Sequence, residues 1–101
     1  MDTFEAIADP TRRRIIELLG SESRNAGSIA AEFSVSRPAI SRHLRVLREC
    51  GVVAVEEQAQ QRIYHLNPDR LSEVAAWIAR YTAFWHDPLS RLADYVESEE
   101  Q

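Results

Sequence analysis

The first twenty residues carry hydrophobic side chains at the spacing of a helix face. A short helix is expected first, and a second helix is expected to begin at Asp9 and Pro10. Asp9 suits the N-cap position, and Pro10 lacks only an N–H that the first turn would leave unpaired. We expect Gly20 to end this second helix. Its apolar face consists of Ile15, Leu18 and Leu19.

The same spacing predicts two further helices between Asn25 and Gly51. Asn25 is expected to cap the earlier one. The apolar face of that helix comprises Ile29, Ala30 and Phe33. After a tight turn, Ser36 is expected to cap the later helix, with Pro38 in its first turn and Gly51 as its stop. The apolar residues of the later helix are Ile40, Leu44 and Leu47.

The spacing changes from helical to strand-like after Gly51. The runs VVAVE (52–56) and RIYHL (62–66) are rich in β-branched and aromatic residues, and a short polar segment separates them. Two such runs predict a two-stranded β-hairpin.

A last helical region is predicted to start at Pro68 and Asp69. Its apolar residues alternate between spacings of three and four, which is the pattern of a coiled-coil seam. These residues are Leu71, Val74, Ile78, Tyr81 and Trp85. Asp87 and Pro88 interrupt the pattern, so this long helix is expected to be broken or kinked near Pro88.

The predicted fold class is mainly α with a small β-hairpin, in the order α-α-α-α-β-β-α. A helix, a tight turn, a second helix and a hairpin are the parts of a winged helix-turn-helix. With 101 residues, the chain is expected to form one domain, 1–101. Within it, residues 25–51 form the helix-turn-helix and residues 52–66 the wing.

Charge is divided unevenly along the chain, whose formal net charge is -4. Residues 1–68 contain nine arginines and nine acids, whereas residues 69–101 contain three arginines and seven acids. All the basic side chains are arginines. The stretch SVSRPAISRHLRVLRECG (34–51) carries four of them and meets no acid before Glu49. The acidic net charge argues against a general coating of nucleic acid, but it says little about a focused basic surface such as this stretch.

A helical projection places these arginines on the outer face of the helix that follows Ser36. If the apolar residues point inward, Pro38, Ser41, Arg42 and Arg45 point outward, with Arg37 and Arg48 at the borders. The second helix of a helix-turn-helix enters the major groove of DNA, where arginine pairs with guanine O6 and N7. We therefore expect double-stranded DNA as the partner.

Three segments together resemble the arsenic-repressor (ArsR/SmtB) group of bacterial winged-helix transcription regulators. They are FEAIADPTRRRIIELL (4–19), SVSRPAISRHLRVLRECGVV (34–53) and RIYHLNP (62–68). The resemblance implies a DNA-binding transcriptional regulator, most simply a homodimeric (auto)repressor on a pseudo-palindromic operator. It also implies contacts to DNA from Ser36, Arg37, Ser41, Arg42 and Arg45 in the helix, and from Arg62 in the wing.

The wing departs from the pattern of that family, whose members often carry a basic, glycine-containing tip. Here the segment from Glu56 to Arg62 reads EEQAQQR. Gln60 and Gln61 can hydrogen-bond phosphate or a base edge, but they neutralise no charge. The wing is therefore expected to displace fewer counterions than a basic wing.

The resemblance further implies a homodimer built on the terminal helices, 1–24 and 69–98. The expected interface consists of Phe4, Ile7, Leu71, Val74, Ile78, Tyr81, Trp85 and Leu92. Trp77 and Phe84 join this aromatic group, which could instead line a small-molecule pocket between subunits. We favour the dimer core, because large aromatic side chains dominate such interfaces.

Metal sensing has little support from the residues. The segment NAGSIAAEF (25–33) lacks the cysteines of the family's thiolate sites, and Cys50 is the only cysteine. The tail FWHDPLSRLADYVE (84–97) resembles a subgroup that is not known for metal sensing. His86, Asp87 and Glu97 are the remaining metal candidates, and a polar bend at Pro88 explains the first two as well. We expect no cofactor.

Features that the sequence lacks reduce the number of functional classes to consider. The sequence shows no Ser/His/Asp constellation and no glycine-rich phosphate loop, so it gives no indication of an enzyme. No apolar run is long enough to span a membrane, and the lone cysteine fits a reducing cytoplasm. Two alternatives stay open: a winged helix used for protein–protein contact, and a metal-responsive repressor with its site on the C-terminal helix.

Overall fold

The computed structural model describes residues 1–82 and 96, and it separates into two compact units. The first unit is Met1–Leu71, and the second is Ser72–Gln101, of which 72–82 and 96 are described. Within the described residues, no helix is both long and apolar enough to cross a membrane.

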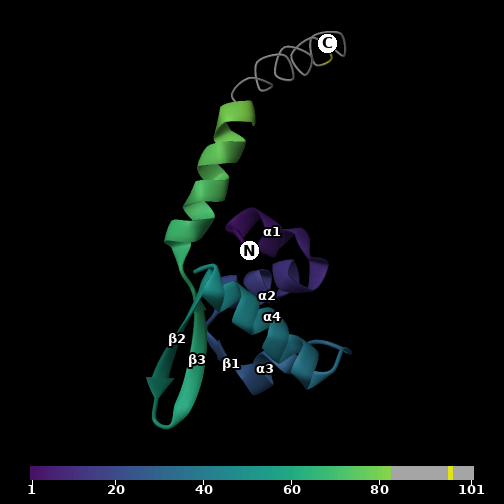
Figure 1. Cartoon of the computed structure of the whole chain (residues 1–101), viewed down its shortest axis with the longest axis vertical. Helices are drawn as coiled ribbons and strands as arrows, with labels where there is room; N and C mark the ends of the chain where they lie inside the picture. Colours follow the sequence, from purple (N-terminus) through teal and green to yellow (C-terminus); the bar gives the residue numbers. More distant parts are fainter. Residues whose placement is uncertain (83–95, 97–101) are drawn as a thin grey trace. The chain divides into compact units, whose positions relative to one another are not determined.

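The first unit begins with two helices, α1 (Thr3–Ala8) and α2 (Pro10–Ser21), each started by an aspartate (Figure 1). The Asp2 carboxylate accepts the Glu5 N–H at 2.8 Å, and Asp9 accepts the Arg12 N–H at 3.0 Å. The predicted cap at Asp9 is confirmed. The predicted end at Gly20 was one residue early, because α2 continues through Ser21.

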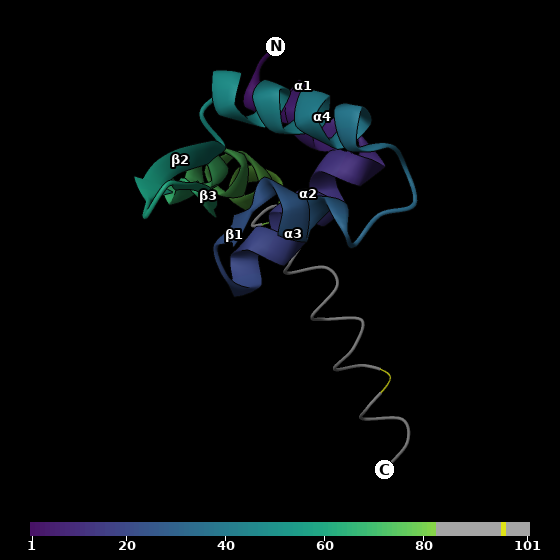
Figure 2. The ribbon, with the colours of Figure 1, turned by 90° about the horizontal axis from the view of Figure 1, so that it is seen from below.

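Helices α3 (Ala26–Ala30) and α4 (Arg37–Glu49) form the helix-turn-helix and pack against each other. Figure 2 shows the two helices and the loop that joins them. Their predicted caps are confirmed, because Asn25 accepts the Ser28 N–H and Ser36 accepts the Ala39 N–H. Helix α4 ends at Glu49, and Gly51 follows the Cys50 C-cap with a φ of +82° that suits glycine.

The end of α4 is a Schellman motif. The Gly51 N–H donates to the Arg48 carbonyl, and the Val52 N–H donates to the Leu47 carbonyl, both at 3.0 Å. These two bonds satisfy carbonyls that the helix end would leave unpaired. The chain therefore leaves the helix in a fixed direction and enters the sheet at once.

The sheet has three antiparallel strands in the order β1-β3-β2: β1 (Arg24–Asn25), β2 (Val53–Gln58) and β3 (Gln61–Leu66). The predicted hairpin is confirmed, but a third strand joins it, since Arg24 pairs with Tyr64. The turn is tighter than expected. Only Ala59 and Gln60 separate the strands, with φ of 48° and 71°, the signature of a type I′ turn.

One hydrophobic core lies between these helices and the sheet. It consists of Ala6, Ile15, Leu19, Ile29, Ile40, Leu44, Leu47, Val52, Val53 and Tyr64. The inward face predicted for α4 is therefore confirmed. Leu71, which the sequence assigned to the dimer seam, is half-buried and packs against this core.

The second unit is helical where it is described. The helix starts at residue 68 in the first unit and is followed to residue 82. Of the predicted seam, Ile78 and Tyr81 are exposed, and the Tyr81 ring lies 5.0 Å from that of Trp77 between centroids. Trp85, Leu92 and the predicted kink at Pro88 lie outside the described residues.

Candidate nucleic-acid interface

A groove of about 470 Å³ runs between the outer face of α4 and strand β3. Its lining comprises Pro38, Ser41, Arg42, Arg45, Arg48, Arg62 and Tyr64. A second hollow of about 390 Å³ adjoins it, where Arg45 and Arg48 meet Glu49. The groove thus combines four guanidinium groups with two hydroxyls, and no carboxylate lines it.

The arrangement of the groove follows from the two elements that form it. Because Ile40, Leu44 and Leu47 are buried, residues 41, 42, 45 and 48 of α4 lie on its outer side. On β3, Arg62 and Tyr64 are two residues apart and share a face of the sheet. Tyr64 is only 7% exposed, so its ring belongs to the core while also contributing to the groove wall.

The predicted DNA-binding residues divide into three locations. Ser41, Arg42, Arg45 and Arg62 line the groove together. Ser36 and Arg37 lie at the exposed start of α4, outside the lining. Gln60 and Gln61 lie at the tip of the hairpin, where Gln61 pairs with Gln58.

Arg48 and Tyr64 also line the groove, although the sequence did not place them among the DNA-binding residues. Arg48 lies three residues after Arg45, which is one helical turn and a usable signal. Tyr64 reads as an ordinary core position of a strand. Only the packing of β3 against α4 brings it to the groove.

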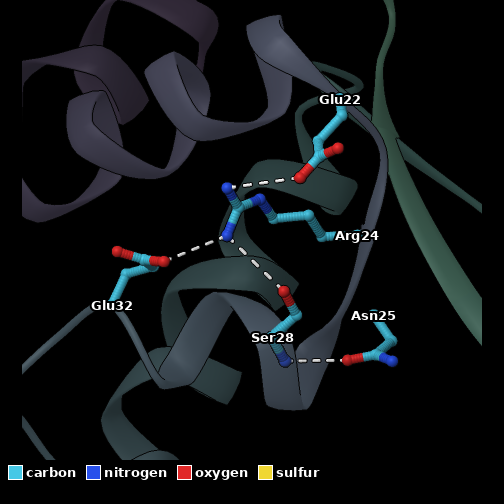
Figure 3. Close-up of polar contacts among 5 residues, drawn as sticks. All are labelled: Glu22, Arg24, Asn25, Ser28 and Glu32. Carbon is cyan, nitrogen blue, oxygen red and sulfur yellow. Dashed lines mark hydrogen bonds and ion pairs between the residues drawn. The ribbon is translucent and has the colours of Figure 1, made fainter.

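Strand β1 holds α3 in place through Arg24, a residue that the sequence analysis missed (Figure 3). Its guanidinium lies 3.3 Å from the Glu32 carboxylate and 3.5 Å from that of Glu22, and it donates to the Ser28 hydroxyl at 3.5 Å. The Arg24 side chain is 18% exposed, so these acids flank a largely covered cation. Its buried Nε has no hydrogen-bond partner among the residues that the structure describes.

Helix α4 is joined to the start of α2 by Asp9, Arg12 and His43. The Arg12 Nη1 lies 3.3 Å from His43 Nδ1, and the Asp9 carboxylate lies 3.9 Å from the same nitrogen. The pKa of Asp9 is lowered, chiefly because its carboxylate accepts the Arg12 backbone N–H, with further help from the charges of His43 and Arg12. Desolvation opposes this shift.

The described part of the structure does not assemble a metal site from the candidate residues. Within the described residues, no three His, Cys, Asp or Glu side chains are grouped as a metal site. His86, Asp87 and Glu97 lie outside those residues. Cys50 is half-buried, and its thiol donates to the Leu47 carbonyl at 3.4 Å.

Known proteins are similar to this chain in both sequence and fold. The family described as "Bacterial regulatory protein, arsR family" matches residues 9–55. The transcriptional repressor SdpR of Bacillus subtilis is 38% identical over 80 residues, which span 79% of this chain and 89% of that repressor. The chain belongs to the arsR family of bacterial regulatory proteins.

Two further relatives agree with the family. The HTH-type transcriptional regulator Rv2034 of Mycobacterium tuberculosis is 35% identical over 95% of this chain and 87% of its own length. A crystal structure titled "Possible transcriptional regulator for arsenical resistance" superposes with a TM-score of 0.72. It is 42% identical and covers 92% of this chain and 94% of its own. The arsR-family chain is therefore a DNA-binding transcriptional regulator, a class distinct from enzymes.

Proposed function

We propose that this protein is a dimeric repressor that inserts α4 into the major groove of a pseudo-palindromic operator, including one near its own gene. The observation that carries the proposal is the groove between α4 and β3, which four arginines line and no carboxylate does. A duplex bears one negative charge per about 1.7 Å of its axis, so such a surface attracts it. The protein would act in the cytoplasm, where bacterial operators lie.

The groove residues fall into two roles by position. Ser41 and Arg42 lie in the second turn of α4 and Arg45 in the third, and the N-terminal part of a recognition helix faces the base edges. Arg42 and Arg45 are the candidates for guanine, since a guanidinium matches guanine O6 and N7. Ser36 and Arg37, at the positive N-terminus of α4, suit phosphate contacts.

Arg48, Arg62 and Tyr64 form the other side of the groove and suit the DNA backbone. Arg48 lies near the end of α4, and Arg62 and Tyr64 belong to β3. Because the groove brings residues from both elements together, one phosphate group could bridge helix and wing. Phosphate contacts set the register of a protein on DNA without specifying its sequence.

The wing tip contributes less charge than the helix. Arg62 pairs across the hairpin with Glu57, and directly opposed residues share one face of the sheet. That carboxylate offsets part of the Arg62 charge. Gln60 and Gln61 remain as hydrogen-bonding groups at the tip, so we expect the salt dependence of binding to come mainly from α4.

Dimerisation is assigned to α1 and to the C-terminal helical region, 69–98. Phe4 of α1 is 40% exposed, and Trp77, Ile78 and Tyr81 are all at least 45% exposed in a single chain. Exposed apolar side chains that lie together on one helix, as Trp77 and Tyr81 do, mark protein interfaces. A dimer would present two recognition helices to successive major grooves, about 34–36 Å apart.

We infer that DNA binding requires no metal or small-molecule effector and is set by protein concentration or by a partner protein. A soft-metal site needs two to four thiolates, whereas each chain supplies only Cys50, whose half-buried thiol donates to the Leu47 carbonyl. The chain is accordingly assigned to a subgroup without the metal-sensing cysteines. His86, Asp87 and Glu97 are the residues that a metal-responsive repressor would have to use.

Footprinting on DNA upstream of the protein's own gene tests the proposal. The expected result is two protected half-sites centred one helical turn apart, unchanged by zinc, nickel or cobalt, and reporter expression that rises when the gene is deleted. Loss of the footprint with a metal would support the metal-responsive alternative. If the upstream DNA is protected no better than random DNA, the alternative of a winged helix used for protein–protein contact is favoured.

A further inference from the structure

The guanidinium of Arg12 contacts two helices besides its own. Its Nε donates to the Ala6 carbonyl at 2.7 Å, and its Nη2 donates to the Glu5 carbonyl at 3.3 Å. Its Nη1 lies 3.3 Å from Nδ1 of His43. Arg12 belongs to α2, the two carbonyls belong to α1, and His43 belongs to α4. One side chain therefore connects three helices.

The contact with α1 satisfies a specific need of that helix. The last four carbonyls of a helix have no partner within it, and Glu5 and Ala6 supply two of these in α1. A positive group at the C-terminal end is also favoured by the helix dipole. Arg12 thus caps α1 and fixes its direction relative to α2.

The contact with α4 is equally directional. A guanidinium has only donors, so a hydrogen bond from Arg12 to His43 requires Nδ1 to be the unprotonated nitrogen of the imidazole. Asp9 lies beside the pair, with its carboxylate 3.9 Å from Nδ1 and bonded to the Arg12 N–H. Asp9 is the N-cap of α2, and Arg12 lies in the first turn of that helix.

His43 occupies α4 between the residues assigned to base contact, Arg42 and Arg45, but on another side of the helix. Its side chain is 22% exposed and does not line the groove. It cannot serve as a groove contact in this arrangement. Its contact with Arg12 instead joins α4 to α2.

We propose that Arg12 and His43 are positioning residues that couple dimer geometry to operator binding. The inference rests on the proposed function, in which α1 takes part in the dimer and α4 reads DNA. Two recognition helices bind one operator together only if their separation is held near one DNA turn. The chain Glu5/Ala6 carbonyls–Arg12–His43 would transmit the position of α1 to α4. Breaking this chain of contacts would make the separation of the two recognition helices less fixed, without altering the DNA-contacting face of either helix.

The test compares a complete operator with a duplex that carries one half-site, at one salt concentration. His43→Leu removes the acceptor, whereas His43→Asn offers a carbonyl oxygen near the position of Nδ1. We expect His43→Leu to lose about tenfold in affinity for the complete operator, the size of one hydrogen bond to a charged group. Its half-site affinity should stay within about twofold of wild type, and His43→Asn should recover most of the loss.

Arg12→Leu should behave like His43→Leu, and Arg13→Leu serves as the matched control on the same helix. Arg13 is exposed and lies next in sequence. Sedimentation confirms that each variant is dimeric, and its thermal midpoint confirms that it is folded. Equal losses on both DNAs, or no rescue by His43→Asn, would overturn the coupling while leaving DNA binding intact. If wild type does not prefer the complete operator to the half-site, the dimeric-repressor proposal fails as well.

Discussion

Nη1 of Arg24 lies 3.3 Å from Oε1 of Glu32 and thereby ties strand β1 to the residues that follow α3. The strand is only two residues long, yet it pairs with β3, which also lines the groove beside α4. Arg24 therefore links the helix-turn-helix, through its side chain, to the wing, through its backbone pairing with Tyr64. The stability of this link can be measured separately from DNA binding.

Removing the Glu32 charge should destabilise the fold more than removing other exposed charges. Glu32→Gln is expected to lower the free energy of unfolding by about 0.5–1 kcal/mol, because it weakens the contact to a largely covered cation. Glu22→Gln should cost less, since its carboxylate is 68% exposed and 3.5 Å away. Glu17→Gln is the control, because both side chains of the Glu17–Arg14 ion pair are exposed. Urea unfolding of the three variants measures this order, and equal losses would contradict it.

Asp9 should make the stability of the fold depend on pH in acid. Because the pKa of Asp9 is lower in the folded chain than its ordinary value of 3.8, the ionised form is favoured by folding. Its contribution is fully present above the unfolded pKa and is lost as pH falls through the folded pKa. Asp9→Asn should flatten this loss below about pH 4.

The same position separates charge from capping. Asparagine is also a good N-cap, so Asp9→Asn should retain much of the stability at pH 7, whereas Asp9→Ala should cost about 1 kcal/mol. Chemical unfolding at several pH values between neutral and acid measures both effects. An Asp9→Asn variant as pH-sensitive as wild type would show that other carboxyl groups cause the acid loss.

Gln60→Gly should stabilise the wing. Gln60 has a φ of 71°, in the left-handed region that favours glycine, and Ala59 before it has a φ of 48°. We expect a gain of about 0.5–1 kcal/mol in the free energy of unfolding, net of the extra freedom of glycine in the unfolded chain. Gln58→Gly, in the adjoining strand, should destabilise instead. A loss at position 60 would mean that its amide makes contacts worth more than the relief of strain.

The features that the sequence predicted are those that depend on near neighbours in the chain. Asp9, Asn25 and Ser36 cap helices through N–H groups three residues away, and Gly51 ends α4 through bonds to the turn before it. The inward face of α4 was likewise correct, because helical periodicity alone determines which side of it is apolar.

The features that the sequence missed depend on strand pairing and on packing between elements. Arg24 and Asn25 form a strand only because β3 offers them an edge, and two residues carry no period of their own. Gln58 and Gln61 looked like loop residues because they are polar, yet their backbones continue the hairpin. Tyr64 reaches the groove only through the packing of β3 beside α4. No local pattern encodes these placements.

A charge in the exposed seam should separate the subunits. Tyr81→Glu would place a carboxylate on a side chain that is 53% exposed in the single chain and that we assign to the dimer. We expect monomers and much weaker operator binding, because burying an unpaired charge is costly. Ala76→Glu is the control, since a helical projection places it on the opposite side of the helix from Ile78. Sedimentation and operator titration measure the two effects, and tight operator binding by Tyr81→Glu monomers would exclude the dimer mechanism.

The most direct test of the account is the base preference of Arg42→Ala. Affinity is measured for wild type and variant on the operator and on duplexes that carry every single base-pair change in one half-site. If Arg42 reads a guanine, the variant should lose about 1–3 kcal/mol on the operator and lose discrimination at one base pair of each half-site. Arg14→Ala, in α2 and outside the groove, should bind like wild type. A uniform loss across all duplexes would instead make Arg42 a phosphate contact, and unchanged binding would contradict the assignment of the α4 groove to DNA.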